Sequence, residues 1–179
     1  FFCSNAQVVL NEDFEGGIPL TWSNENLEPL GDPSEIWTID NSGLAYYVST
    51  TAQYMYTAAG MSGNYAIFNS DAYGLNGAED AALTSPAFDC SGLSTVVLSF
   101  NEWFTGGYNG AAYVEVSADG GSTWTAVVNY PTTNTDLEYG EQIIDITSIV
   151  GTSANAHVRF RYTGDYSLYY AIDNVVVQQ

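Results

Sequence analysis

The chain has 179 residues, of which 2 are Lys or Arg and 21 are Asp or Glu, so its formal net charge is −19. Nucleic acids and anionic membranes attract basic surfaces, and two basic residues cannot form one, which excludes both as partners. Hydrophobic residues make up 46% of the sequence, which excludes a disordered chain. The length suits one domain, and no apolar run approaches the ~18 residues of a membrane-spanning helix.

Short apolar stretches with a period of two recur along the chain, and helix signals are nearly absent. In chain order, strand-like patterns cover residues 8–10, 46–49, 53–57, 64–69, 96–101, 113–117, 124–128, 157–162 and 171–177. The pattern is regular at 157–162, where Val158, Phe160 and Tyr162 alternate with polar side chains. Gly-rich residues 118–122 join two of these strands as a hairpin loop. Many short strands at this spacing predict an all-β fold of antiparallel strands.

An apolar extension precedes the predicted domain. Residues 1–7 are expected to be a signal remnant or a donor-type strand, and residues 8–179 a single domain. Phe1 and Phe2 are candidate assembly residues, because an N-terminal strand can add to the sheet of a neighbouring subunit. Cys3 and Cys90 are candidates for one disulfide, and the alternative is two buried free thiols.

Several motifs follow one another along the chain. They are NEDFEGGIP at 11–19, ALTSPAFD at 82–89, VEVS and DGGSTW between 114 and 124, VRFRY at 158–162 and AIDNV at 171–175. This ordered set resembles the cleaved-adhesin or choice-of-anchor (MAM-like) jelly-roll domain family of Bacteroidetes surface proteins. The resemblance implies a jelly-roll β-sandwich of two antiparallel sheets. It also implies a secreted protein, extracellular or at the cell surface, that usually binds calcium.

The resemblance further implies where calcium would bind. In the family, carboxylates near the first and last strands meet, which here points to Asp13, Glu15 and Asp173, with Asp80 as a further candidate. The residues give an independent reason, because Asp173 lies in an otherwise apolar strand and a carboxylate there needs a cation or several donors. The alternative is that most of these acids are solvated surface charges.

The sequence argues against catalysis. No glycosidase carboxylate motif of the jelly-roll type is present, and the single histidine, His157, lies in a predicted strand. The motif around Asp119 matches the Asp-box pattern, which we interpret as structural because its side chain can bond the amides of the turn. We therefore predict that the protein is not an enzyme.

Two non-catalytic functions remain open. The first is an adhesin-type module that binds glycan or protein ligands, with Tyr73, Trp103 and Tyr108 as candidate binding residues in loops rich in aromatic and amide side chains. For each of these rings the alternative is a place in the core. The second is a self-assembling subunit of an extracellular filament, joined to copies of itself through the N-terminal segment.

Overall fold

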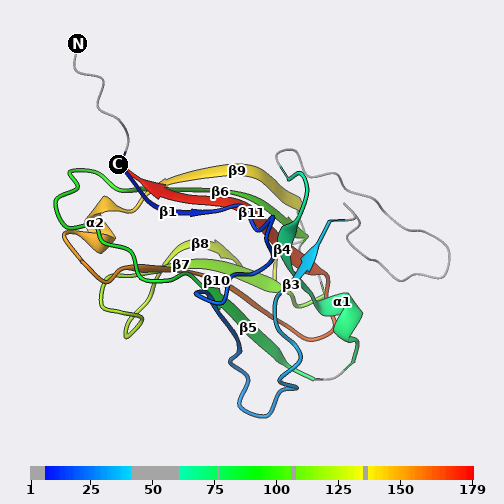
Figure 1. The fold of residues 1–179 in the computed structure, drawn as a ribbon. Coiled ribbons are helices and arrows are strands. Elements are labelled where there is room, and N and C mark those ends of the chain that lie inside the picture. Colours follow the sequence, from blue (N-terminus) through cyan, green and yellow to red (C-terminus); the bar gives the residue numbers. More distant parts are fainter. Residues whose placement is uncertain (1–6, 42–60, 76, 106–107, 135–136) are drawn as a thin grey trace.

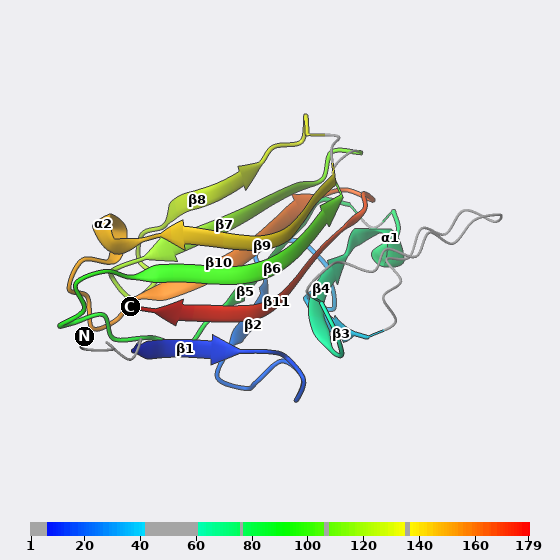
Figure 2. The ribbon, with the colours of Figure 1, turned by 90° about the horizontal axis from the view of Figure 1, so that it is seen from above.

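The computed structural model describes residues 7–41, 61–75, 77–105, 108–134 and 137–179. Within these ranges the strands form two layers (Figures 1 and 2). A six-stranded sheet has the order β3 (Thr38–Asp40), β4 (Tyr65–Asn69), β11 (Tyr169–Gln178), β6 (Val97–Thr105) and β9 (Leu137–Asp145), and β1 (Val8–Glu12) also pairs with β11. A five-stranded sheet has the order β2 (Ser23–Asn26), β5 (Glu79–Thr84), β10 (His157–Gly164), β7 (Ala111–Ser117) and β8 (Thr125–Tyr130). All pairings between these strands are antiparallel, which confirms the predicted jelly-roll β-sandwich.

The core follows from the alternation of side chains along the strands. In β10, Val158, Phe160 and Tyr162 are fully buried between the sheets, as the sequence pattern predicts. The inner face of β6 contributes Leu98 and Phe100, and the Phe100 ring meets the Phe160 ring edge-on at a centroid distance of 5.2 Å. Burial of such large apolar side chains supplies most of the favourable free energy of folding.

Short loops and two short helices close the two ends of the sandwich. At one end lie α1 (Ser70–Tyr73), the turn from β10 to β11 and the start of β5 (Figure 1). At the other end lie α2 (Thr147–Val150) and the hairpin between β7 and β8. Residues 27–37 connect β2, an edge strand of one sheet, to β3, an edge strand of the other, so this loop crosses the gap between the layers. None of the helices described is long and apolar enough to cross a membrane.

Some predicted features fall outside the described residues. These are the strands expected at 46–49 and 53–57, and Phe1, Phe2 and Cys3. Cys90 is described as a buried free thiol in the main core, and because Cys3 lies outside the described residues, their pairing stays a prediction. Burial raises the pKa of this thiol, and the neighbouring Asp89 charge raises it further, so Cys90 has the character of an inert core residue. Assembly through Phe1 and Phe2 stays a prediction.

Candidate functional site

The last strand changes neighbour halfway along one edge. While β6 pairs with β11 on one side, β4 pairs with it opposite Tyr169–Ile172 and β1 opposite residues 175–178. Between these two segments the register with β6 shifts, in a bulge between Asp173 and Val176. Asn174 lies in this bulge with a φ of 52°, a left-handed conformation that Asn tolerates better than most residues. The bulge therefore places Asp173 where β1 and β4 leave the edge of β11.

Asp173 is a buried carboxylate at this junction, with an exposed fraction of 1%. Its Oδ1 accepts a hydrogen bond from the Asn174 backbone N–H at 2.7 Å, and its Oδ2 accepts one from Asn174 Nδ2 at 3.0 Å. Burial raises the pKa of Asp173 to about 6, despite hydrogen bonds from the backbones of Asn174 and Ser62. The charges of Glu15 and Asp13 raise this pKa as well, so the predicted first-strand acids lie near Asp173.

The turn after β1 directs these two acids. Phe14 is fully buried with a φ of 53°, while Asp13 and Glu15 on either side of it are exposed. The carboxylate of Glu15 lies over Gly63, where a Cβ would be only 1.8 Å from Glu15 Oε1. Asn64 fixes the same turn, because its Nδ2 donates to the Glu15 carbonyl oxygen at 2.8 Å. The structure thus brings Asp13 and Glu15, from the turn after β1, near Asp173 of β11.

Asp80 does not belong to this cluster. It lies in β5 of the other sheet, where both of its oxygens accept from Arg161, at 2.7 Å from Nε and 2.6 Å from Nη2. The guanidinium supplies the counter-charge that the prediction assigned to calcium. In the part of the chain that the structure describes, no group of three or more Asp, Glu, His or Cys side chains could hold a metal ion. A cation at the Asp173 junction would therefore need backbone or water oxygens too.

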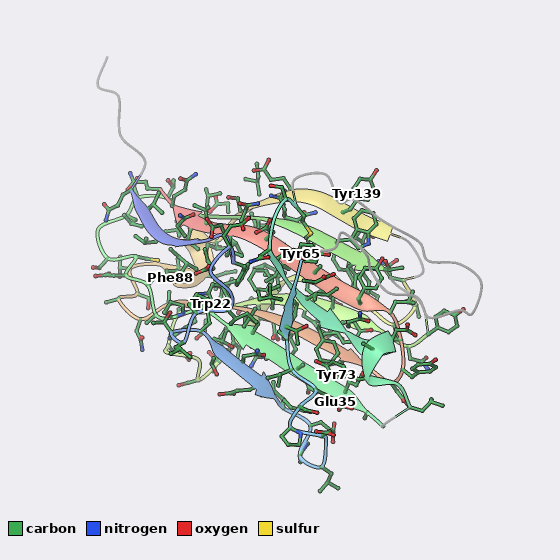
Figure 3. The ribbon with its side chains drawn as sticks, turned by 45° about the vertical axis from the view of Figure 1, so that its right-hand side comes forward. Trp22, Glu35, Tyr65, Tyr73, Phe88 and Tyr139 are labelled. Carbon is green, nitrogen blue, oxygen red and sulfur yellow. The ribbon has the colours of Figure 1, made fainter. Side chains whose placement is uncertain are left out.

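A second feature is an aromatic row on the outer face of the six-stranded sheet. The pairing registers place Ile67 of β4, Ala171 of β11, Trp103 of β6 and Tyr139 of β9 side by side. Trp103 is 7% exposed, and its Nε1 donates to the Tyr169 hydroxyl at 3.0 Å. The Tyr139 ring lies 5.5 Å from the Trp103 ring and is 58% exposed (Figure 3). Trp103 therefore supports an exposed ring and offers little surface itself.

The other two predicted binding tyrosines differ from each other. Tyr73 of α1 is half-buried, its ring packs against Phe68, and its hydroxyl donates to the Ile36 carbonyl at 2.5 Å. Tyr108 is 68% exposed in the loop after β6. Sequence reasoning missed Tyr139, because the strand that carries it was not predicted. It also missed Tyr166, a 41% exposed ring in the turn between β10 and β11.

The hairpin between β7 and β8 supports the structural interpretation of its Asp-box motif. Asp119 accepts hydrogen bonds from the backbone N–H and hydroxyl of Thr123 at 2.8 and 2.7 Å, and from the Ser117 hydroxyl at 2.8 Å. These bonds lower the pKa of Asp119 to about 2. These partners all lie within the same hairpin, so the carboxylate holds the turn in shape.

His157 and Glu102 make structural contacts. His157 Nδ1 lies 2.9 Å from the Ser85 carbonyl oxygen. Glu102 is fully buried and accepts hydrogen bonds from the hydroxyls of Tyr130 at 2.5 Å and Tyr170 at 2.9 Å. Burial raises the pKa of Glu102, and the two tyrosine hydroxyls satisfy its oxygens within the core.

Comparison with known proteins places the fold. No family model and no curated protein matches the chain. Among solved structures, the K3 cleaved adhesin domain of Lys-gingipain from Porphyromonas gingivalis aligns over 97% of this chain and 99% of its own, with a TM-score of 0.62 and 20% identity. The fold is cleaved-adhesin-like.

Proteins of other functions share this architecture. The carbohydrate-binding module TmCBM61, solved with β-1,4-galactotriose, aligns over 96% of this chain and 97% of its own, with a TM-score of 0.58 and 15% identity. The Stig cyclase Fisc from Fischerella sp. TAU aligns over 97% and 98%, with a TM-score of 0.53 and 14% identity. At these identities the likeness concerns the fold, and the function has to be argued from the residues.

Proposed function

We propose that this chain is a non-catalytic, secreted adhesin-type module that binds glycans on the outer face of its six-stranded sheet. The observation that carries the proposal is the aromatic row, in which the exposed Tyr139 ring packs beside the Trp103 ring of the neighbouring strand. A sugar ring stacks its apolar face on such a platform through the same apolar and dispersion contacts that aromatic side chains make in cores. Adhesin domains and glycan-binding modules with this fold support the assignment.

Polar side chains beside the platform suit a neutral glycan. The next row of the register places Asp173 of β11, Asn101 of β6 and Glu141 of β9 alongside the aromatic row. Glu141 is exposed and offers carboxylate oxygens that accept hydrogen bonds from sugar hydroxyls. The same carboxylates, in a chain of net charge −19, would repel sulfated or sialylated sugars.

Binding to a panel of neutral and anionic glycans, followed by calorimetry on the best ligand, tests this proposal. We expect Tyr139→Ala to weaken binding about tenfold or more, as for an aromatic anchor at an interface. Tyr108→Ala is the matched control, because this ring is similarly exposed but lies in a loop at the end of the sandwich. Loss of affinity in Tyr108→Ala with full affinity in Tyr139→Ala would contradict the site. A wild-type protein that binds no glycan would contradict the function.

We also propose that Asp173 binds one calcium ion at the junction of β1, β4 and β11, with backbone and water oxygens completing the shell and the charges of Asp13 and Glu15 nearby. The support is a buried, incompletely neutralised Asp173 with two further carboxylates nearby, in a chain with few basic residues. A bound ion would hold the first and last strands together and fix the bulge next to the aromatic row.

A further inference from the structure

A pair of buried acids lies at the α1 end of the sandwich, apart from the junction at Asp173. Glu35, in the loop between β2 and β3, is 2% exposed, and Glu79, at the start of β5, is 3% exposed. In each side chain the Oε1 atom is buried and has no hydrogen-bond partner in the described structure. Glu35 and Tyr73 of α1 lie beside each other (Figure 3), and the Tyr73 hydroxyl is bonded to the residue after Glu35.

The loop that carries Glu35 is fixed by local hydrogen bonds. Asp32 Oδ1 accepts from the Ser34 N–H at 2.9 Å, and the Glu35 N–H donates to the Asp32 carbonyl at 3.0 Å. Asn24 of β2 then holds the backbone of Trp37 on both sides, donating at 2.7 Å and accepting at 3.0 Å. The burial of Glu35 therefore follows from the conformation of its loop, which these hydrogen bonds fix.

Glu79 points into the sandwich because of its position in β5. It shares a face of the strand with Ala81 and Leu83, both core residues, whereas Asp80 points outward to Arg161. Ser70 Oγ donates to Glu79 Oε2 at 2.6 Å. Burial raises the pKa of Glu79 to about 7 against this hydrogen bond, and the charges of Glu35 and Asp165 raise it as well, so Glu35 lies close enough to Glu79 to interact with it electrostatically.

A third oxygen lies in the same place. The hydroxyl of Tyr162, a fully buried residue of β10, has no hydrogen-bond partner in the described structure. Two glycines leave room around it. A Cβ at Gly164 would lie 3.1 Å from Glu79 Oε2 and 3.3 Å from the Tyr162 hydroxyl, and one at Gly110 would lie 2.6 Å from that hydroxyl. The hydroxyl is thus a further buried oxygen near the Glu79 carboxylate, beside the side chains of Ser70 and Ser167.

No basic side chain neutralises this cluster. The chain has two basic residues and no lysine, and both are arginines of β10. Arg159 pairs with Glu115 at 2.7 Å and Arg161 with Asp80 at 2.6 Å, both on the outward-facing side of the strand. A buried carboxylate without a partner is costly, and two neighbouring ones are more so, unless a cation or a proton balances them.

We propose that Glu35 and Glu79 bind a calcium ion at the α1 end of the sandwich, with the Tyr162 hydroxyl facing the same site. The available donors are carboxylate and hydroxyl oxygens, which suit a hard cation. Zinc would require nitrogen or sulfur ligands, and the single His and the described Cys lie elsewhere, beside Ser85 and in the core. Calcium accepts irregular sets of 6–8 oxygens, so water can complete the shell, whereas magnesium demands a near-octahedral one.

Such an ion would join parts of the fold that the sandwich itself connects weakly. Glu35 lies on the loop that crosses between the sheet edges, and Glu79 is bonded through Ser70 to α1. Ser70 Oγ also accepts from the Ser167 N–H at 2.6 Å, in the turn from β10 to β11. One ion would therefore tie the crossing loop, α1 and this turn together. This inference depends neither on glycan binding nor on the junction at Asp173.

Native mass spectrometry of the whole chain at increasing calcium tests the proposal by counting bound ions. We expect Glu35→Gln/Glu79→Gln to bind one calcium ion fewer than the wild type and to lose part of the calcium-dependent rise in Tm. Glu25→Gln is the control, because it removes one charge from an exposed position of β2. Asp173→Asn reports separately on the other junction, so the two sites are distinguishable.

Hydrogen exchange on the unmodified protein keeps the proposal testable if the double variant does not fold. Calcium should protect the backbone amides around Glu35 and Glu79, and this protection should persist in Asp173→Asn. An unchanged ion count in the double variant overturns the proposal. The proposal is also overturned if the double variant raises the Tm above that of the wild type by the same amount with and without calcium, because a proton and not an ion would then balance the pair. Exchange that does not respond to calcium around both residues overturns it as well.

Discussion

The effect of Asp173→Asn on the free energy of unfolding should have opposite signs in calcium-free and calcium-loaded protein. In the metal-free chain, burial raises the pKa of Asp173 from 3.8 to about 6. At about 1.36 kcal/mol per pH unit, this rise corresponds to about 3 kcal/mol of destabilisation when the carboxylate is charged. Asn has nearly the same shape and cannot ionise, so in EDTA at pH 7.5 the variant should be up to about 3 kcal/mol more stable than the wild type.

The stability difference between the wild type and Asp173→Asn should depend on pH. A folded-state pKa above the unfolded value means that the folded protein holds the proton more tightly, so the wild type loses stability as the pH rises from about 4 to about 6. The advantage of Asp173→Asn in EDTA should therefore vanish near pH 4 and reach its full value above pH 7. Urea denaturation at several pH values measures this.

In calcium, the wild type should be more stable than Asp173→Asn. With millimolar calcium the wild type gains the free energy of ion binding, whereas the variant lacks a carboxylate ligand at the junction and gains less from it. A variant that is less stable than the wild type in EDTA at pH 7.5 would refute the reasoning about burial. A variant that keeps its advantage unchanged in calcium would refute the ion site at Asp173 and leave the burial argument intact.

Two further predictions concern the fold around these sites. Phe160→Ala should cost about 3–5 kcal/mol in urea denaturation, because it empties a fully buried ring position, whereas Ile143→Ala at a 67% exposed position should stay within about 0.5 kcal/mol. Gly63→Ala should lower stability by about 1 kcal/mol or more, because φ is +83° and the new Cβ would meet the Glu15 carboxylate. Gly16→Ala is the control, since nothing lies within 4 Å of its Cβ position, and equal melting of the two variants would contradict the packing of Glu15 on Gly63.

The sequence predicts strands well where one face is buried and the other is not. In β10 the alternation of Val158, Phe160 and Tyr162 with polar side chains is visible in the sequence and is confirmed in the structure. In β9 the pattern is weaker, because this edge strand alternates exposed and half-buried residues, with Gly140 in its middle. Tyr139 was missed for that reason.

The alternation of side chains along β5 explains why Asp80 is not part of the cluster at Asp173. Asp80 was a further calcium candidate because it lies just before the ALTSPAFD motif, but side chains of neighbouring residues in a strand point to opposite faces. In β5 this directs Asp80 outward to Arg161 and Glu79 inward to Ser70. The sequence contains both acids side by side, and only the register with β10 decides which one is buried.

The two acidic sites share a physical origin in the composition of the chain. A β-sandwich leaves polar gaps where a strand changes neighbour and where a loop crosses between the sheets, and this chain has a buried carboxylate at each: Asp173 at the first and Glu35 at the second. In most proteins a lysine or arginine could neutralise such a group. Here both arginines are committed to carboxylates on the outer side of β10, so neutralisation has to come from solution. A proton would be lost near neutral pH, where the pKa of Asp173 is already exceeded, whereas calcium at millimolar concentration would remain. The scarcity of basic residues is therefore the reason to expect stability that depends on divalent cations.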